Sequence, residues 1–413
     1  MKSPSSSELD RQVGPDDTYG RRRTGRNGRT GRPRSRRRRW WKSRPFRIAR
    51  ALLLVFLVWL IWSLGGALIA PGGDSVAARV AEWARDNHMG AIVTALESAQ
   101  YNANPPALGG KPTIALKPPA ETTAPKPNAA TTTTVAAPVL PPRLVSPAGA
   151  ALPDEGTWQV LAQVNGAPAL VGAYLRPDAA HTSYVAGVVS MDPRILRFEL
   201  HPGTTDPGSG NWGVAPTIAA GSRAGLLATF NGGFKVNESG GGFFLNGVTR
   251  GTLTPGIASL VFYKDGHVAV GVWGRDVTMT ADVVGVRQNL HLVVDQSAVP
   301  AGVDSNVQSA WGPTIGGKEF VWRSGVGVTA DGRIIFVYGP ALSVRTLADL
   351  LHQAGCVEAM QLDINPAWMS FMYYNPAPDP ANPTPTKLLP TQERPADRYF
   401  TPTSRDFVAV YAR

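Results

Sequence analysis

The chain has 413 residues and a single cysteine, which excludes an intramolecular disulfide. Its net charge of +11 is concentrated at one end: the first 50 residues hold 17 Lys and Arg against 4 Asp and Glu, whereas the remainder holds 24 against 26. Because the rest of the chain is nearly neutral, the sequence gives no support for a nucleic-acid-binding surface on its folded part.

Residues 1–47 are expected to form a disordered tail on the cytoplasmic side, because they are rich in arginine and show no apolar periodicity. The tail either only sets membrane topology or also binds anionic lipid or nucleic acid. Residues 51–70 read ALLLVFLVWLIWSLGGALIA and carry no charge. At about 1.5 Å per residue, this run spans the hydrocarbon core of a bilayer.

We therefore expect a retained transmembrane signal anchor at residues 48–72, in contact with membrane lipid. A cleaved signal peptide is the alternative, but its apolar region is usually only about 7 to 15 residues long. The positive-inside rule then places the N-terminus in the cytoplasm and everything after the anchor outside the membrane.

Two segments of different composition follow the expected anchor. Residues 74–103 predict a juxtamembrane helical segment, because Asp74 or Ser75 can cap a helix and apolar residues recur at helical spacing. Residues 104–150 are rich in Pro, Ala and Thr, which favours an extended linker that holds a domain away from the membrane.

Residues 154–413 are expected to form one ordered domain, which is long enough for a single large core. Asp265-Gly266 and Asp331-Gly332 each lie between two apolar runs, which predicts two hairpins. A further strand is expected near the C-terminus, from Phe407 to Tyr411.

One helix is predicted within this domain, from the sequence SVRTLADLLHQAGC at residues 343–356. Thr346 and Asp349 fit a capping box, leucines recur on one face, and Gly355 can end the helix. The fold class predicted is therefore α+β: a large mixed, mostly antiparallel twisted sheet with a few packed helices, preceded by a single transmembrane helix.

Several kinds of site have no support in the sequence. The six histidines show no metal-ligand spacing and there is no cysteine pair, so no zinc site is predicted. No Gly-x-Ser-x-Gly elbow is present, which disfavours an ordinary α/β-hydrolase. A divalent cation such as calcium, bound by carboxylates alone, stays open as a cofactor, although no loop spacing requires it.

Three segments occur in an order that resembles the phosphodiester glycosidase family. They are TFNGGF (229–234), WRSGVGVTADGRIIFVYG (322–339) and TLADLLHQAGCVEAMQLDINPAW (346–368). The family pattern has an Asn-Gly-Gly-Phe-Phe turn, an Arg-(Ser/Thr)-x-x-Gly strand, a Leu-Ala-x-Leu-Leu helix and an Asp-Gly-Gly-Gly-Ser motif that ends a buried strand. The resemblance covers roughly residues 184–368.

The match holds residue by residue over most of these motifs, at Asn231, Gly232, Gly233 and Phe234, then Arg323, Ser324 and Gly327, then Leu362 and Asp363. Lys235 stands where the family usually has a second aromatic residue. The sequence DINPAW (363–368) stands where the family has the triple glycine and serine.

The resemblance implies cleavage of a sugar-1-phosphate diester at its glycosidic bond. The phosphate leaving group is a weak base, so one ionised carboxylate acting as nucleophile or base is enough, together with groups that hold the phosphate. Asp363 is the first candidate, because it ends an apolar, strand-like run. The alternative is that Asp363 only caps a turn before Pro366. Glu238 is a candidate second carboxylate, or else an exposed loop residue.

Six further residues complete the expected site. Arg323 either holds a phosphate bidentately or pairs with a carboxylate such as Glu319. Asn231 can donate to a sugar hydroxyl, and the amides of Gly232 and Gly233 can form an anion-binding nest. Asn-Gly is also a strong hairpin signal, and a tight turn is compatible with a role in the site. The remaining candidates for substrate binding are Ser324 and Asn365.

We therefore expect a membrane-anchored, extracytoplasmic glycosidase that acts on a sugar-1-phosphate diester or a related envelope glycan. The lack of disulfides and the Arg, Pro and Ala bias favour a bacterial envelope. A non-catalytic glycan-binding module of the same fold and a structural cell-envelope protein are the alternatives. The sequence does not indicate an oligomeric state.

Overall fold

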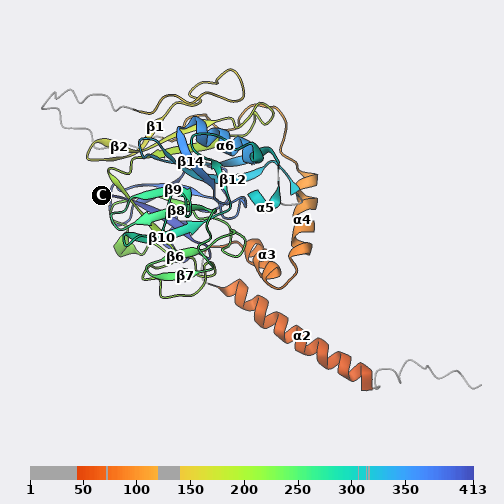
Figure 1. Ribbon diagram of the computed structural model, residues 1–413. Helices are drawn as coiled ribbons and strands as arrows, with labels where there is room; N and C mark the ends of the chain where they lie inside the picture. Colours follow the sequence, from red (N-terminus) through yellow and green to blue (C-terminus); the bar gives the residue numbers. More distant parts are fainter. Residues whose placement is uncertain (1–43, 71–72, 120–139, 306, 313, 315–316) are drawn as a thin grey trace, which may run out of the picture. The chain divides into compact units, whose positions relative to one another are not determined.

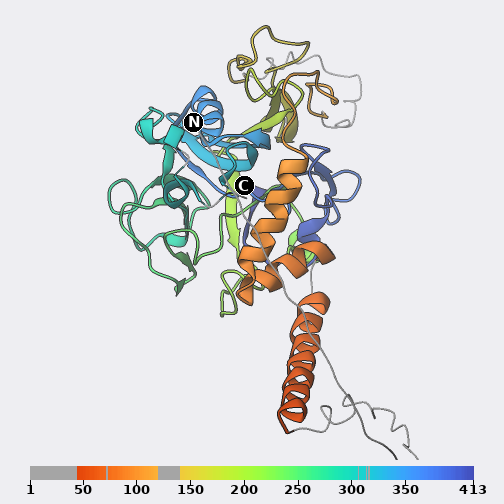
Figure 2. The ribbon, with the colours of Figure 1, turned by 90° about the vertical axis from the view of Figure 1, so that its right-hand side faces the viewer.

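The computed structural model describes residues 44–70, 73–119, 140–305, 307–312, 314 and 317–413 (Figures 1 and 2). Most of the expected tail, at residues 1–43, and the middle of the expected linker, at residues 120–139, lie outside the described residues. The chain divides into two units, residues 1–62 and residues 63–413.

The first helix, α2 (Arg44–Ile69), has 26 residues, none of them buried. Its length and apolar composition are sufficient to cross a membrane, and a signal sequence has the same two features. In the second unit, Ser75 caps α3 (Val76–Asp86), where its Oγ accepts a hydrogen bond from the amide of Ala78 at 3.2 Å. Helix α4 (Gly90–Ala103) follows after a short turn.

Among the described residues, the domain contains three sheets in which the named strands pair antiparallel, so the predicted α+β class is confirmed although one large sheet was expected. The first sheet has seven strands, in the order β1 (Gln159–Val164), β2 (Ala167–Leu175), β3 (Ala186–Met191), β13 (Ile334–Leu342), β12 (Val321–Thr329), β14 (Cys356–Gln361) and β11 (Leu292–Val294).

The other two sheets have five strands each. One has the order β7 (Val248–Arg250), β6 (Phe243–Leu245), β10 (Val283–Gln288), β8 (Ala258–Tyr263) and β9 (Val268–Val272). The other has the order β16 (Thr384–Lys387), β15 (Phe371–Asn375), β5 (Leu226–Asn231), β17 (Phe407–Ala412) and β4 (Leu196–His201). Short helical turns lie at η1 (Ala220–Ser222), η2 (Ala301–Ser305), α5 (Gln308–Trp311) and η4 (Arg398–Phe400).

Both predicted hairpins are present. Strands β8 and β9 turn at Gly266, with φ of 81°, and β12 and β13 turn at Gly332, with φ of 83°. Glycine is favoured where φ is positive, because it has no Cβ. The Asp-Gly dipeptides therefore mark these two turns.

The predicted helix is α6 (Val344–Gln353), but its cap is not the expected one. The Oγ of Ser343 accepts a hydrogen bond from the amide of Thr346 at 3.0 Å, so the helix begins before Thr346. Asp349 instead pairs with Arg345, one turn away along the helix, at 3.0 Å. Figure 1 shows α6 beside β12 and β14, against which its buried leucines pack.

The seven-stranded sheet packs against the sheet that contains β5 and β15 through a shared apolar core. The ring of Phe336 on β13 lies 5.1 Å from that of Phe230 on β5 and 5.3 Å from that of Phe371 on β15. All three side chains are buried. This contact brings the end of β5 next to the ends of β12 and β14, where the three sequence motifs lie.

Candidate active site

A cavity of about 580 Å³ lies where these strand ends meet. Its size is within the range of about 300 to 1,000 Å³ that is typical of ligand pockets. The lining residues come from four strand ends and from two helices. The residues after β5, before or at the start of β12, after β14 and before β17 are Phe234, Lys235, Glu238, Thr314, Gly317, Val321, Asp363, Ile364, Asn365, Trp368 and Arg405. The residues of α3 and α4 are Glu82, Arg85, Gly90, Thr94 and Glu97.

Hydrogen bonds join one residue of each motif. The Nδ2 of Asn231 donates to the Oγ of Ser324 at 3.0 Å, and that Oγ accepts from the amide of Asp363 at 3.1 Å. The Ser324 amide donates to the carbonyl of Asp363 at 2.9 Å. Asn231 also accepts from the amide of Ser370 at 3.1 Å. Asn231 and Ser324 therefore hold the backbone of Asp363 in place, whereas both were expected to contact substrate.

We expect Ser324→Ala to lower the free energy of unfolding by about 1–3 kcal/mol, because it leaves the buried Nδ2 of Asn231 and the amide of Asp363 without this acceptor. Chemical denaturation of the variant measures the effect. Ser305→Ala, at an exposed position, is the control and should change stability little. An equal effect of the two substitutions would contradict a positioning role for Ser324.

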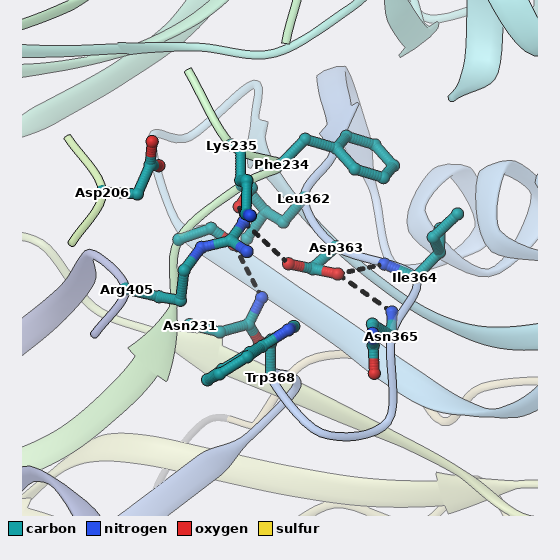
Figure 3. Close-up of polar contacts among 12 residues, drawn as sticks. Asp206, Asn231, Phe234, Lys235, Leu362, Asp363, Ile364, Asn365, Trp368 and Arg405 are labelled. Atoms are coloured by element: carbon teal, nitrogen blue, oxygen red, sulfur yellow. Dashed lines mark hydrogen bonds and ion pairs between the residues drawn. The ribbon is translucent and has the colours of Figure 1, made fainter. Parts of the chain in front are cut away.

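Asp363 has two differently placed oxygens. Its Oδ1 accepts from the amides of Ile364 at 2.7 Å and Asn365 at 2.9 Å, while its Oδ2 lies 3.6 Å from Nη2 of Arg405 (Figure 3). Burial raises the pKa of Asp363, and Arg405 and the two amides oppose that rise. One oxygen therefore caps a turn, as the alternative interpretation held, and the other faces the cation at the cavity.

The DINPAW segment forms the turn after β14. The Oδ1 of Asn365 accepts from the amide of Ala367 at 2.9 Å, and the carbonyl of Asn365 accepts from the amide of Trp368 at 2.9 Å. Asn365 lines the cavity, as does Trp368, whose ring lies 5.5 Å from the guanidinium carbon of Arg405. Asn365 thus holds the turn, and Asn365 and Trp368 form part of one wall of the cavity.

The structure does not place Arg323 where the sequence suggested. Its side chain is fully buried and donates to the carbonyls of Leu342 and Glu319 and to the Oε1 of Gln361, at 2.9, 3.1 and 2.8 Å. It does not line the cavity. Burial lowers the pKa of this guanidinium to about 10. The expected bidentate phosphate contact is therefore replaced by three bonds that tie β12 to its surroundings.

Gly232 and Gly233 do not form a hairpin turn or a free nest. Strand β5 pairs with β15 and β17, and the two glycines are not among the residues with positive φ. The amide of Gly232 donates to the carbonyl of Asp406 at 3.0 Å. A Cβ on Gly232 would lie 2.1 Å from Oδ2 of Asp406, and one on Gly233 would lie 2.8 Å from Oδ1 of Asn289. Glycine is needed here because the backbone approaches buried polar groups.

Asp406 belongs to a buried ion pair behind the cavity. Its Oδ2 lies 2.9 Å from Nε of Arg287, and neither side chain is more than 1% exposed. Arg287 also donates to the carbonyl of Gln288 at 2.8 Å. Because removal of one partner would leave a buried charge unpaired, this pair makes the contact with Gly232 intolerant of change.

Glu238 lines the cavity from an exposed position in the loop after β5. Its exposure agrees with the interpretation as a loop glutamate, and its position at the cavity leaves a role as second carboxylate a prediction. Among the described residues there is no group of three or more His, Cys, Asp or Glu side chains that could hold a metal ion.

Sequence reasoning missed the role of Arg405 and the cavity positions of Lys235 and Trp368. Arg405 precedes β17 and faces Asp363 although the two are far apart in sequence, and no motif marks it. Lys235 carried a signal, because it stands where an aromatic residue is usual in the resembled family. The carboxylate of Glu82 on α3 at the cavity was not predicted, because the sequence suggested ordinary packing for this helix, or contact with the bilayer or a second copy.

Comparison with known proteins agrees with the motifs. Residues 217–363 match the model of the phosphodiester glycosidase family, so the resemblance inferred from the motifs is confirmed. No curated protein matches the chain.

Three solved structures are similar to the chain at low identity. The catalytic domain of zebrafish N-acetylglucosamine-1-phosphodiester alpha-N-acetylglucosaminidase, described as auto-inhibited by its pro-peptide, is 13% identical, with a TM-score of 0.37; the match covers 62% of this chain and 87% of that one. A hypothetical protein from Synechocystis is 13% identical, with a TM-score of 0.34, over 62% and 64% of the two chains. A putative exported protein from Burkholderia pseudomallei is 14% identical, with a TM-score of 0.27, over 55% and 74%.

Proposed function

We propose that this chain, which carries a phosphodiester glycosidase domain, is a membrane-anchored extracytoplasmic glycosidase that hydrolyses a sugar-1-phosphate diester or a related envelope glycan. The observation that carries the proposal is the position of Asp363. Its Oδ2 lies at a cavity and faces Arg405 at 3.6 Å, while its other oxygen is held by two amides. The two amides fix the orientation of this carboxylate, and its Oδ2 is the oxygen that a substrate in the cavity could meet.

In the proposed reaction, Asp363 acts as base or as nucleophile. As a base, it takes a proton from a water whose oxygen bonds to the anomeric carbon while the bond from that carbon to the phosphate oxygen breaks. As a nucleophile, its own oxygen bonds to the anomeric carbon as that bond breaks, and water then displaces the carboxylate and releases its proton to solvent. In both cases the phosphate monoester leaves with the bonding electrons. Because this leaving group is a weak base, it needs little help from a general acid. The ring of Trp368 offers an apolar face against which a sugar can pack.

A second candidate is a glycan-binding module without hydrolytic activity. It is favoured by the engagement of Oδ1 of Asp363 in the DINPAW turn, where it accepts two amide hydrogen bonds. In this case glycan would bind in the same cavity and leave it unchanged.

The localisation is part of the proposal. Helix α2 would be the membrane anchor, with the arginine-rich N-terminus in the cytoplasm and the domain in a bacterial envelope. Chemical labelling of cysteines introduced at position 10 and at position 331 in intact cells tests it. An impermeant reagent should label only the second position.

The activity is tested with the full-length chain in detergent micelles, incubated with a panel of sugar-1-phosphate diesters and envelope glycans, with and without calcium. Release of reducing sugar supports the enzyme. Saturable binding of a panel member with no release from any of them supports the binding module instead.

We expect the acid limb of the activity profile to follow the ionisation of Asp363. Burial raises the pKa of this carboxyl while Arg405 lowers it, so Arg405→Gln should raise the pKa further. Activity that needs the carboxylate is lost as pH falls, and the limb should therefore move to higher pH in the variant. The rate of sugar release between pH 4 and pH 9 measures it.

Arg345→Gln, at an exposed position on α6, is the matched control and should leave the limb in place. A limb that does not move in Arg405→Gln would show that Asp363 is not the group that titrates.

A further inference from the structure

Two basic side chains flank Asp363 at the cavity. Lys235 follows β5 and Arg405 precedes β17, and they are only 9% and 6% exposed. A buried cation is costly unless an anion compensates it. Arg405 faces Asp363, and its Nη2 also donates to the carbonyl of Gly233 at 3.1 Å. Its Nε is buried without a hydrogen-bond partner among the described residues.

Glu82 on α3 is an anionic partner that these two cations share. One carboxylate oxygen of Glu82 lies 2.8 Å from Nζ of Lys235, and the other lies 3.6 Å from Nη1 of Arg405. Asp86, one turn further along α3, adds a contact of 3.1 Å with Nζ of Lys235. Burial opposes the charge on Lys235, but Glu82 and Asp86 together hold its pKa above the usual value.

We propose that Lys235 and Arg405 form a phosphate-binding subsite beside Asp363, and that Glu82 occupies this subsite in the structure as an internal competitor. The inference rests on the proposed function, because it assigns the phosphate group of the substrate to these cations. A carboxylate with one oxygen on each cation stands in for a phosphate oxygen pair. Arg405 faces both Glu82 and Asp363, so a phosphate at this subsite would bring the adjoining glycosidic bond to the carboxylate.

The contacts that hold the α3–α4 segment on the domain are mainly polar. Asp74, which precedes α3, pairs with Arg394 at 3.0 Å and accepts from the Oγ of Ser404 at 2.6 Å. On α4, Tyr101 donates to the carbonyl of Phe320 at 2.9 Å.

Little apolar surface of this segment is buried. Ala84 on α3 and Val93 on α4 are the buried residues of the two described helices, and the four apolar core clusters include neither of them. Because Glu82 contacts Lys235 and Arg405 through ionic contacts and belongs to none of the four core clusters, a phosphate group can take its place on these cations without disturbing the core.

The test measures binding of inorganic phosphate to the full-length chain in detergent by calorimetry. Glu82→Gln should bind phosphate about tenfold more tightly than the original chain, because it removes the competing charge. Lys235→Met added to Glu82→Gln should remove this gain. Asp349→Asn is the matched control: Asp349 lies on α6, does not line the cavity and pairs with Arg345 at 3.0 Å, so the phosphate affinity of this variant should stay unchanged.

A second measurement needs no variant. Saturating phosphate should speed hydrogen exchange of the backbone amides of α3 in the original chain, because α3 loses its contact with Lys235. Equal phosphate affinity of Glu82→Gln and the original chain, or unchanged exchange in α3, would overturn the subsite.

The outcomes for the subsite and for the enzyme are separate. Tighter phosphate binding by Glu82→Gln with no hydrolysis of any diester would support the subsite and contradict the glycosidase. Hydrolysis at the same KM in Glu82→Gln and the original chain, without inhibition by phosphate, would support the glycosidase and contradict the subsite.

Discussion

Asp363→Asn is expected to lower the rate of diester hydrolysis at least about a thousandfold, because an amide can serve neither as nucleophile nor as base. The substitution keeps the shape of the side chain. The Oδ1 of the new amide can still accept from the amides of Ile364 and Asn365, which bond to Asp363 at 2.7 and 2.9 Å. Loss of activity would therefore report the chemistry of the carboxylate.

The same substitution should leave the domain as stable as before, or stabilise it. Burial raises the pKa of Asp363 in the folded state, so ionisation of this group costs folded-state stability as pH rises through that pKa. An asparagine does not ionise, so the variant does not lose this stability as pH rises. The variant should match the original chain at low pH and have the higher melting temperature above the folded-state pKa.

Sugar release and thermal unfolding, measured on the same preparations, check both halves of this prediction. Asp304→Asn, at a side chain that is 60% exposed, is the matched control and should change neither quantity much. Activity retained in Asp363→Asn would refute the role of this carboxylate. Lost activity together with a strongly lowered melting temperature would indicate that Asp363 is mainly structural.

Gly232→Ala is expected to destabilise the domain by at least about 3 kcal/mol. The new Cβ would lie 2.1 Å from Oδ2 and 2.8 Å from the carbonyl oxygen of Asp406. Something must move, and the groups nearby are a buried carboxylate and the backbone at the start of β17. Displacement of Asp406 would weaken its pair with Arg287, in which both side chains are buried.

Urea denaturation of the full-length chain in detergent measures this loss. Gly221→Ala is the control, because a Cβ at that position meets no atom within 4 Å and the substitution should cost little. Similar stabilities of the two variants would show that the backbone near Gly232 moves to accept a Cβ, and would contradict the prediction.

The parts of the fold that the sequence predicts well are those with local causes. The dipeptides at Gly266 and Gly332 mark hairpins because the turn itself needs a positive φ. The helix at α6 follows from its stripe of leucines. The residue at which α6 begins was not predicted, since Ser343 and Thr346 are both residue types that cap helices. In the structure Ser343 is the cap. The division into three sheets depends on pairings between distant strands.

The candidate site was predicted in part. Asp363 could be proposed because it ends an apolar strand in a motif, and the structure places it at the cavity. Arg323 belongs to a motif too, yet its guanidinium points into the sheet and bonds to Gln361. A motif records that a residue type is needed, and it does not distinguish contact with substrate from support of the backbone. Arg405 had no local signal, because only the pairing of β17 with β5 brings it to Asp363.

The position of β17 has a consequence for how the protein is made. This strand follows every other strand of the domain in the sequence, but it lies inside its sheet, between β5 and β4. Until residues 405–412 have been synthesised, β5 and β4 present unpaired edges and the cavity lacks Arg405. The nascent domain therefore exposes strand edges to aggregation until its synthesis is nearly finished, and a chain released before residue 405 would keep these edges unpaired.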